Sequence, residues 1–362
     1  MARAANRRRR RGGVVYAVVL NDKEGSLVFR FRRKDLFDDD DDPPPAPRRR
    51  FPRPVAHFPR GYYRYVFHSF TVSGKQILWV SPFGATVVIE DDGRPGGSGA
   101  MRAGPELGTT TCQPILLPIR DDMVLVMAYL PQPAGRSNFA VMRRLPDGGG
   151  GGGGWRVVPV PEPPLGGPGD YYCRKPAPVV TAYMTIGRRA WVSIAGEGTF
   201  SLDAGGAAAW RKEGSWELPL HGQAMYVREL GAAIGLGRGP GPYGGVVLCL
   251  CACDVEARPP VIRRSWNETF PRELVAAHSQ YDCPGNLVYV GDGRFCICWV
   301  AGVEHDRLET NGMVARTAVV TMAVRLRRSA GGELQLTECG KLRYHLMSPQ
   351  GRRAYFVQPH IP

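Results

Sequence analysis

The sequence contains no apolar stretch long enough to cross a membrane. Its longest apolar runs, residues 14–20 and 246–253, have the length of strands, whereas a spanning helix needs roughly 18 residues. The first 13 residues, MARAANRRRRRGG, lack the apolar segment of a secretory signal. The nine cysteines are odd in number and scattered, which favours reduced thiols. We therefore expect a cytoplasmic or nuclear protein that is neither secreted nor bound to a membrane.

Motifs of catalysis and nucleotide binding are also missing. The sequence has no G-x-S-x-G, P-loop, H-E-x-x-H or zinc-finger spacing. The glycine-rich residues 235–245 contain two prolines and precede an expected strand, so they do not fit a dinucleotide-binding turn. His305 lies beside Glu304 and Asp306 in an expected loop, and we interpret His221 as a structural hydrogen-bonding residue. We predict no catalytic residue, no cofactor and no metal site.

Long helices are excluded by composition. The 362 residues include 46 glycines and 32 prolines, and both residue types oppose helix interiors. Hydrophobic residues make up 43% of the chain and seven tryptophans are present, which is enough for a packed core. Only residues 273–280, after Pro271, have a helical pattern, so we predict an all-β fold.

Alternation of apolar and polar residues predicts a series of short strands. The glycines of residues 196–198 suit a tight turn between two of them. The expected strands cover residues 14–20, 26–32, 75–80, 85–90, 123–130, 139–143, 155–160, 190–195, 199–203, 225–227, 231–236, 245–254, 261–266, 286–290, 294–300, 317–325, 333–338, 341–346 and 354–357.

These strands group into units of three to four strands that recur about every 40–50 residues, as in propeller blades. In kelch blades a tryptophan precedes the outer strand, and Trp155, Trp210 or Trp216, and Trp266 fall near that place. We predict a kelch-like β-propeller of about five to six blades, formed by one domain of residues 14–358. Two β-sandwiches are the alternative architecture.

Two consequences of the propeller prediction concern ring closure and the core. Residues 14–32 should pair with residues 341–357, because neither terminal pair of strands completes a unit alone. Five apolar side chains in the middle of the chain should be largely buried: Trp191, Phe200, Trp210, Trp216 and Leu218.

Three segments are expected to lie outside the core. Residues 37–57 form an insertion with five consecutive aspartates, prolines and arginines, residues 147–154 form a glycine loop between two strands, and residues 359–362 form a short tail. The aspartate run lacks the turn and the spacing of a calcium loop.

The basic residues are concentrated near the N-terminus. Residues 1–60 hold 16 of the 47 basic side chains and 8 of the 33 acidic ones. Residues 1–13 are predicted to be a disordered tail, and its arginine run is interpreted as a solvated tail, a nuclear-import signal or a phosphate-contacting arm. The run consists of Arg7, Arg8, Arg9, Arg10 and Arg11.

Two groups of cysteines alternate along expected strands. Cys249, Cys251 and Cys253 share one face, and Cys296 and Cys298 share another. Same-face neighbours on a strand lie about 6.5–7 Å apart, too far for two sulfurs that share a zinc ion at about 2.3 Å each. We therefore assign these cysteines to core packing.

Several segments carry a resemblance to a known family. Residues 185–230 (TIGRRAWVSIAGEGTFSLD onward), 248–255 (LCLCACDV), 287–300 (LVYVGDGRFCICWV), 341–346 (KLRYHL) and 18–36 (VVLNDKEGSLVFRFRRKDL) resemble a grass-type plant family of uncharacterised proteins, known as domain of unknown function 1668. The resemblance implies a kelch-like β-propeller and no catalytic residues.

The predicted fold favours one function over three alternatives. Propellers commonly present loops from a rigid scaffold, so we expect a non-enzymatic protein-interaction scaffold with an unknown protein partner. The alternatives are a nuclear nucleic-acid-associated protein that uses the basic tail, a substrate-recognition subunit of a ubiquitin ligase, and an enzyme with a site in the central pocket. Strands that begin near Val14 leave no room for an N-terminal F-box in this sequence.

Overall fold

The structure is a computed structural model of the chain. It describes residues 14–21, 25–32, 51–59, 69–91, 93–94, 97, 99–108, 113–131, 138–146, 154–165, 178–203, 209–240, 246–269, 286–307, 313–340, 343–346 and 351–357. Within these ranges the chain is all-β, with strands and two short 3₁₀ helices. Neither of these helices is long and apolar enough to cross a membrane.

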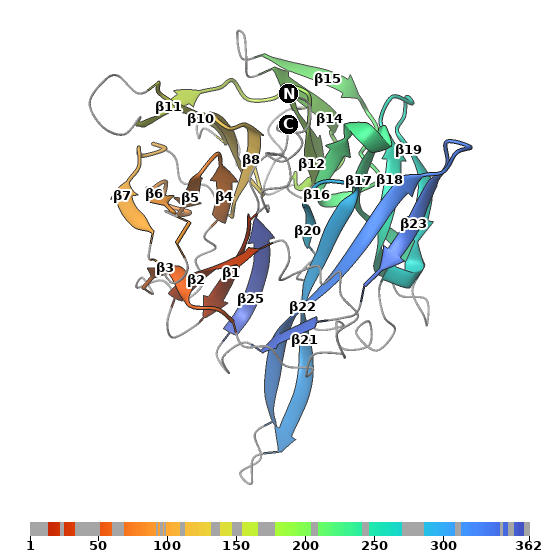
Figure 1. Cartoon of the computed structure of the whole chain (residues 1–362). Coiled ribbons are helices and arrows are strands. Elements are labelled where there is room, and N and C mark those ends of the chain that lie inside the picture. The colour runs from red at the N-terminus through yellow and green to blue at the C-terminus, as the bar shows by residue number, and fades with distance from the viewer. Residues whose placement is uncertain are drawn as a thin grey trace, which may run out of the picture.

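The strands form six antiparallel units that follow one another along the chain (Figure 1). Unit 1 contains β1 (Val14–Asn21), β2 (Gly25–Arg32), β3 (Pro54–Phe58) and β25 (Gly351–Val357). Unit 2 contains β4 (Ser69–Ser73), β5 (Gln76–Val80), β6 (Thr86–Glu90) and β7 (Ala100–Ala103). Unit 3 contains β8 (Pro114–Arg120), β9 (Met123–Ala128), β10 (Phe139–Arg144) and β11 (Trp155–Pro159).

Units 4 and 5 share one sheet of eight strands. Unit 4 contains β12 (Val180–Ile186), β13 (Arg189–Ile194), β14 (Gly198–Asp203) and β15 (Trp210–Gly214). Unit 5 contains β16 (His221–Val227), β17 (Ala232–Pro240), β18 (Val246–Asp254) and β19 (Val261–Trp266), with η1 (Arg228–Leu230) and η3 (Asn267–Thr269). The two halves are joined where β12 and β16 run parallel.

Unit 6 contains the longest strands. It consists of β20 (Asn286–Tyr289), β21 (Arg294–Arg307), β22 (Met313–Arg328), β23 (Leu334–Cys339) and β24 (Arg343–Leu346). The hairpin of β21 and β22 projects beyond the other units in Figure 1.

Both faces of the inner strands are buried, because each unit packs between two others. All six residues of β9 are buried. Met123, Leu125 and Met127 pack towards unit 4, whereas Val124 and Val126 pack towards unit 2. The period of two along a strand thus divides one apolar run between two cores.

Six apolar cores join the units in sequence. Five of them connect units 1 and 2, 2 and 3, 3 and 4, 4 and 5, and 5 and 6. The sixth connects unit 6 to unit 1 through residues such as Phe31 and Cys298. The first strands also contact one another in the order β25, β4, β8, β12, β16, β20 and again β25.

The prediction that the termini pair is confirmed for the last strand and wrong for the one before it. β25 pairs with β1 over Tyr16–Val357 to Asn21–Gly351. β24 instead pairs with β22. It lies beside residues 318–321 of β22, next to the part of β22 that pairs with β23. The C-terminal strand alone therefore completes unit 1.

The insertion predicted at residues 37–57 is too long at its end. Residues 54–57 belong to β3, which pairs with β2, and Val55 and Ala56 are buried. Proline is compatible with this strand because Pro54 is its first residue and β3 is an edge strand. The prolines in and before this segment interrupt the alternation of apolar and polar residues, so the strand was not predicted.

Most predicted strands are present, with ends that differ by a few residues. None of the expected ranges covers β3, β4, β7, β8, β12 or β15, and β21 and β22 are longer than expected. The loop expected around His305 is wrong, because this residue lies in β21 opposite Ala315. Two prolines in β8, Pro114 and Pro118, disguise a strand whose other residues are mostly buried.

The burial prediction holds for three of its five residues. Trp191, Phe200 and Leu218 are buried. Trp210 and Trp216 are only partly buried and pack against the edges of two cores. Both lie near the outer strand of unit 4, where water reaches one side of the ring.

Strand β17 of unit 5 contains several small residues, and they are tightly packed. Ala232, Ala233 and Ile234 are buried. A Cβ on Gly237 would lie 2.5 Å from the Cys251 sulfur. Small side chains are therefore required here by the neighbouring strand.

Several predictions lie outside the described residues. These are the N-terminal tail with Arg7–Arg11, the aspartate run of residues 38–42, the glycines of residues 147–153, the helix at residues 273–280 and the last residues 359–362. The strands flanking the glycine loop, β10 and β11, do pair as the predicted hairpin.

Candidate partner-binding surface between units 4 and 5

The contact between units 4 and 5 contains polar groups as well as apolar ones. On β13 and β14, Val192 and Phe200 face the core shared with unit 3. The alternate face carries Trp191, Ser193 and Thr199 towards unit 5, and all three are buried. Period-two alternation therefore places a row of hydroxyl groups beside a tryptophan at this contact.

These hydroxyl groups hold the segment that links the two units. The Ser193 and Thr199 hydroxyl oxygens are 2.7 Å apart. The Leu218 backbone N–H donates to the Ser193 Oγ at 2.9 Å, and the Thr199 hydroxyl donates to the Trp216 carbonyl oxygen at 2.8 Å. The buried hydrogen bonds fix the backbone on both sides of Glu217, and so they position the Trp216 ring.

Two tryptophan rings and one arginine form the centre of the surface. Trp191 and Trp216 stack with ring centroids 6.4 Å apart and an interplanar angle of 26°. The Arg258 guanidinium carbon lies 5.2 Å from the Trp191 centroid and 5.7 Å from that of Trp216. A guanidinium within about 6 Å of a ring face is attracted by the ring quadrupole. Arg258 is therefore held on unit 4 although it belongs to unit 5.

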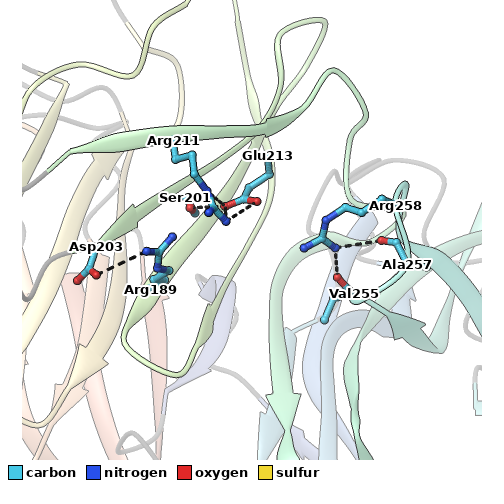
Figure 2. Close-up of polar contacts among 8 residues, drawn as sticks. All are labelled: Arg189, Ser201, Asp203, Arg211, Glu213, Val255, Ala257 and Arg258. Carbon is cyan, nitrogen blue, oxygen red and sulfur yellow. Dashed lines mark hydrogen bonds and ion pairs between the residues drawn. The ribbon is translucent and has the colours of Figure 1, made fainter.

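The loop between β18 and β19 also binds the Arg258 side chain. Figure 2 shows the guanidinium turned towards the carbonyl groups of Val255 and Ala257. Its Nη1 group donates to both oxygens, at 3.0 Å in the case of Ala257. Arg258 itself remains exposed to solvent. The result is an exposed cation with a fixed orientation.

A buried carboxylate lies on β15 close to this arginine. The side chain of Glu213 is only 5% exposed. It accepts hydrogen bonds from the Ser201 hydroxyl at 2.5 Å and from Arg211 at 2.6 Å (Figure 2). Burial alone would raise the pKa of Glu213, but these hydrogen bonds and the charges of Arg211 and Arg258 outweigh it and lower the pKa. Glu213 is thus a stable anion in this surface.

Other exposed cations of units 4 and 5 fall into two groups. Arg189 pairs with Asp203 at 3.8 Å, and Arg263 pairs with Asp254 at 2.7 Å. Five exposed cations have no carboxylate partner among the described residues: Arg188, Lys212, Arg228, Arg258 and Arg264. We call Arg258 and Trp216 the basic surface. Lys212 lies on the other face of unit 4, over Phe200, and Arg264 lies opposite Ala252, which faces unit 6.

The cysteines assigned to packing are core residues. Cys249, Cys251 and Cys253 are buried between units 4 and 5, and Cys296 and Cys298 between units 6 and 1. Neighbouring sulfurs lean together, to 3.5 Å in the first group and 3.6 Å in the second. This is closer than strand spacing suggests, because the side chains tilt along the strand. In the described ranges no group of three metal-binding side chains converges.

The two histidines weighed as site residues lie apart in the chain's strands. His221 begins β16 and is partly buried, and His305 lies in β21 of unit 6. The arginine tail falls outside the described residues, so its interpretation stays a prediction.

Analysis of the sequence missed the basic surface. Trp216 was identified as a core residue, and Arg258 was not identified at all. The only local signal was Arg258-Pro259-Pro260 between two expected strands, which marks a turn. Its contact with two tryptophans of another unit depends on the packing of units far apart in the sequence.

Comparison with known proteins gives one family match. The profile of the family described as Protein of unknown function (DUF1668) matches residues 12–344, which include every strand except β25 and the end of β24. No curated protein matches the sequence.

Proposed function

The chain belongs to the DUF1668 family, and we propose that it is a non-enzymatic scaffold that binds a protein partner through the basic surface of units 4 and 5. The observation that carries this proposal is the exposed Arg258, fixed across the two tryptophans of the neighbouring unit. Aromatic and arginine side chains held rigidly are the residues on which binding energy concentrates in interfaces. A grass-type plant origin and a cytoplasmic or nuclear location belong to the same proposal.

The architecture that we infer is a kelch-like β-propeller with six blades, each blade being one unit. Three features support it: units that follow the chain order, a core between each pair of neighbours, and first strands that contact each other in cyclic order. A terminal strand that completes the first blade is a common way to protect sheet edges in such folds. A crystal structure with two stacked sandwiches would contradict this inference.

Rigid propellers suit a scaffold role because their loops and outer strands are held in fixed positions. Arg258 lies in the loop between β18 and β19, the third and fourth strands of unit 5. It is therefore presented by elements that pack on a buried core. The conformational entropy of this surface is already lost when the protein folds, so less entropy is lost when a partner binds.

The test is a comparison of captured partners between three forms of the protein. Tagged wild type, Arg258→Gln and the control Arg156→Gln are purified from their native cells and their partners are quantified by mass spectrometry. Arg156 is an exposed arginine on β11, the outer strand of unit 3. We expect a partner that is retained by Arg156→Gln and depleted by Arg258→Gln. Equal capture by all three forms would refute the proposed surface.

A further inference from the structure

We infer that Cys249 and Cys251 form a reversible redox site, a pair of thiols on β18 that hydrogen peroxide oxidises to a disulfide. The inference goes beyond the proposed function, since it concerns the core between units 4 and 5 rather than a partner. It is carried by the distance between the two sulfurs, by the space in which they meet and by an exposed hydroxyl group beside one of them.

The two sulfurs meet above a position that has no side chain. They lie 3.5 Å apart, and a disulfide bond of about 2.05 Å needs only a small rotation of each side chain. Gly237 lies opposite Cys249 on β17, and a Cβ there would lie 2.5 Å from the Cys251 sulfur. The Cys249 sulfur lies 3.7 Å from the Gly237 carbonyl oxygen. The missing side chain of Gly237 therefore leaves the space in which the sulfurs can join.

A disulfide at these positions would be strained and easily reduced. Same-face neighbours on a strand have Cα atoms about 6.5–7 Å apart, at the upper end of the range of about 4.4–6.8 Å that is usual in disulfides. Strained disulfides have more oxidising potentials and are the labile ones. The thiol and disulfide forms can therefore interconvert, which suits a redox site better than a permanent cross-link.

An exposed serine lies between the Cys251 sulfur and solvent. Ser265 lies opposite Cys251 on β19 and is exposed, and its hydroxyl oxygen lies 3.4 Å from the Cys251 sulfur. The Cys251 side chain itself is buried. Hydrogen peroxide contains two heavy atoms, so it needs far less room than a maleimide to reach a sulfur directly beneath an exposed residue.

Cys251 is the sulfur that attacks the peroxide. The thiolate is the nucleophilic form of cysteine. The hydrogen bond from the Cys249 thiol lowers the pKa of Cys251 although burial opposes it, and the Ser265 hydroxyl adds to the lowering. The Cys251 thiolate attacks one oxygen of hydrogen peroxide and the O–O bond breaks. The hydroxide that leaves takes up the proton that the thiol lost, which gives water and a sulfenic acid on Cys251.

Cys249 completes the reaction as the resolving thiol. Its sulfur attacks the sulfur of the sulfenic acid, and the S–S bond forms as the S–O bond breaks. The hydroxyl group leaves with the proton of Cys249 as a second water. The two thiols lose two electrons and the peroxide gains them, so no other reactant is required.

A disulfide fits these surroundings better than a metal ion does. Leu218, Leu220 and Ala224 belong to the same core, so the medium around the sulfurs is apolar. Cu(I) held by two thiolates would carry one net negative charge, which is costly to bury without a partner, whereas a disulfide is neutral. Across the described ranges no third metal-binding side chain joins the pair.

Cys296 and Cys298 provide a control within the same molecule. Their sulfurs lie 3.6 Å apart, but the two residues that lie opposite Cys298, Asn286 and Thr321, are not exposed. Burial raises the pKa of Cys298 well above its usual value. Distance alone would make the two pairs react alike, whereas access and ionisation favour the pair on β18.

Oxidation by peroxide followed by peptide mass spectrometry tests the inference. Full-length protein is reduced, freed of reductant and treated with hydrogen peroxide, and the remaining thiols are alkylated after denaturation. We expect the Cys249–Cys251 disulfide, with an alkylated Cys253, to form at least about tenfold faster than the Cys296–Cys298 disulfide. This is the change in thiolate fraction for a pKa difference of about one. Reduced glutathione should restore both thiols.

Two variants separate the roles of the sulfurs. Cys249→Ser removes the resolving thiol, so Cys251 should stop at the sulfenic acid and be labelled by dimedone. Cys251→Ser removes the attacking thiolate, so Cys249 should stay reduced. The matched control Cys298→Ser removes one thiol of the other pair and should leave the oxidation on β18 unchanged. Thermal unfolding of each variant checks that it is folded.

Three results, all obtained with the wild type, would overturn the inference. Equal rates for the two cysteine pairs would mean that proximity alone controls the reaction. Free thiols at Cys249 and Cys251 after the exposed Cys339 has been oxidised would exclude the site. Labelling of either thiol by N-ethylmaleimide as fast as the disulfide forms would show that peroxide acts on an opened protein. None of these measurements depends on the folding of a variant.

Discussion

The buried ion pair between units 1 and 2 offers the sharpest test of how the units are held together. Arg30 on β2 donates to both carboxylate oxygens of Asp91, at 2.7 and 2.9 Å. The Tyr16 hydroxyl on β1 donates to the same carboxylate at 2.8 Å. The side chains of Arg30 and Asp91 are 10% and 2% exposed. Three polar groups from two units are therefore removed from water together.

Replacing Asp91 by leucine removes the carboxylate and leaves the other two groups in place. The Arg30 charge would then lie in the contact without an anion, and the Tyr16 hydroxyl would lose its acceptor. Breaking one side of a buried pair costs about 3–5 kcal/mol. We expect Asp91→Leu to lower the free energy of unfolding by this amount, measured as a lower urea midpoint at an unchanged slope.

The matched control is Asp122→Leu, which removes the partner of Arg120 at the surface. In this pair the side chains are 35% and 49% exposed, and exposed pairs contribute about 0–1 kcal/mol. The triple variant Tyr16→Phe, Arg30→Met, Asp91→Leu should recover much of the loss, because it removes all three polar groups. If Asp91→Leu costs no more than Asp122→Leu, the claim that this pair is desolvated is wrong.

Three further predictions concern the core and the pH dependence of stability. Gly237→Ala should destabilise the protein by about 1–3 kcal/mol through overpacking, since the new Cβ would lie 2.5 Å from the Cys251 sulfur; adding Cys251→Ala should reverse part of the loss in urea unfolding. N-ethylmaleimide followed by peptide mass spectrometry should label the exposed Cys339 in the folded protein while the five buried cysteines react only on unfolding. The lowered pKa of Glu213 contributes stability that is complete above its usual value of 4.5 and is lost as pH falls through the folded-state pKa; Glu213→Gln should flatten this acid dependence in thermal unfolding, and a parallel curve for both proteins would argue against it.

The sequence was sufficient to predict the fold class and many strands, because burial on both faces leaves a strong apolar signal. β9 and β13 were recognised from this signal. β3 and β8 were hidden by prolines, which are tolerated at a strand's first residue and where no ladder hydrogen bond is needed. Local composition cannot distinguish such positions from a loop.

The basic surface could not be predicted for a different reason. Trp191, Trp216 and Arg258 contact each other across two units, so their relation depends on the angle at which the units pack. The sequence marks each tryptophan as apolar and the arginine as a turn residue. Only the three-dimensional arrangement shows that the guanidinium carbon lies 5.2 and 5.7 Å from the two ring centroids.

The pairing of β25 with β1 has a consequence for synthesis on the ribosome. Units 2 to 5 consist of strands that are continuous in sequence, so each can form soon after it emerges. The strands β1 to β3 of unit 1 emerge first, yet the fourth strand of this unit, β25, is translated last. Throughout elongation β1 presents an unpaired edge, and the apolar residues that later meet unit 6 stay uncovered. A premature stop codon just before β25 would release a nearly complete polypeptide in which the edge of β1 stays unpaired. Such an edge can pair with other chains, so this product would aggregate or be bound by quality-control chaperones.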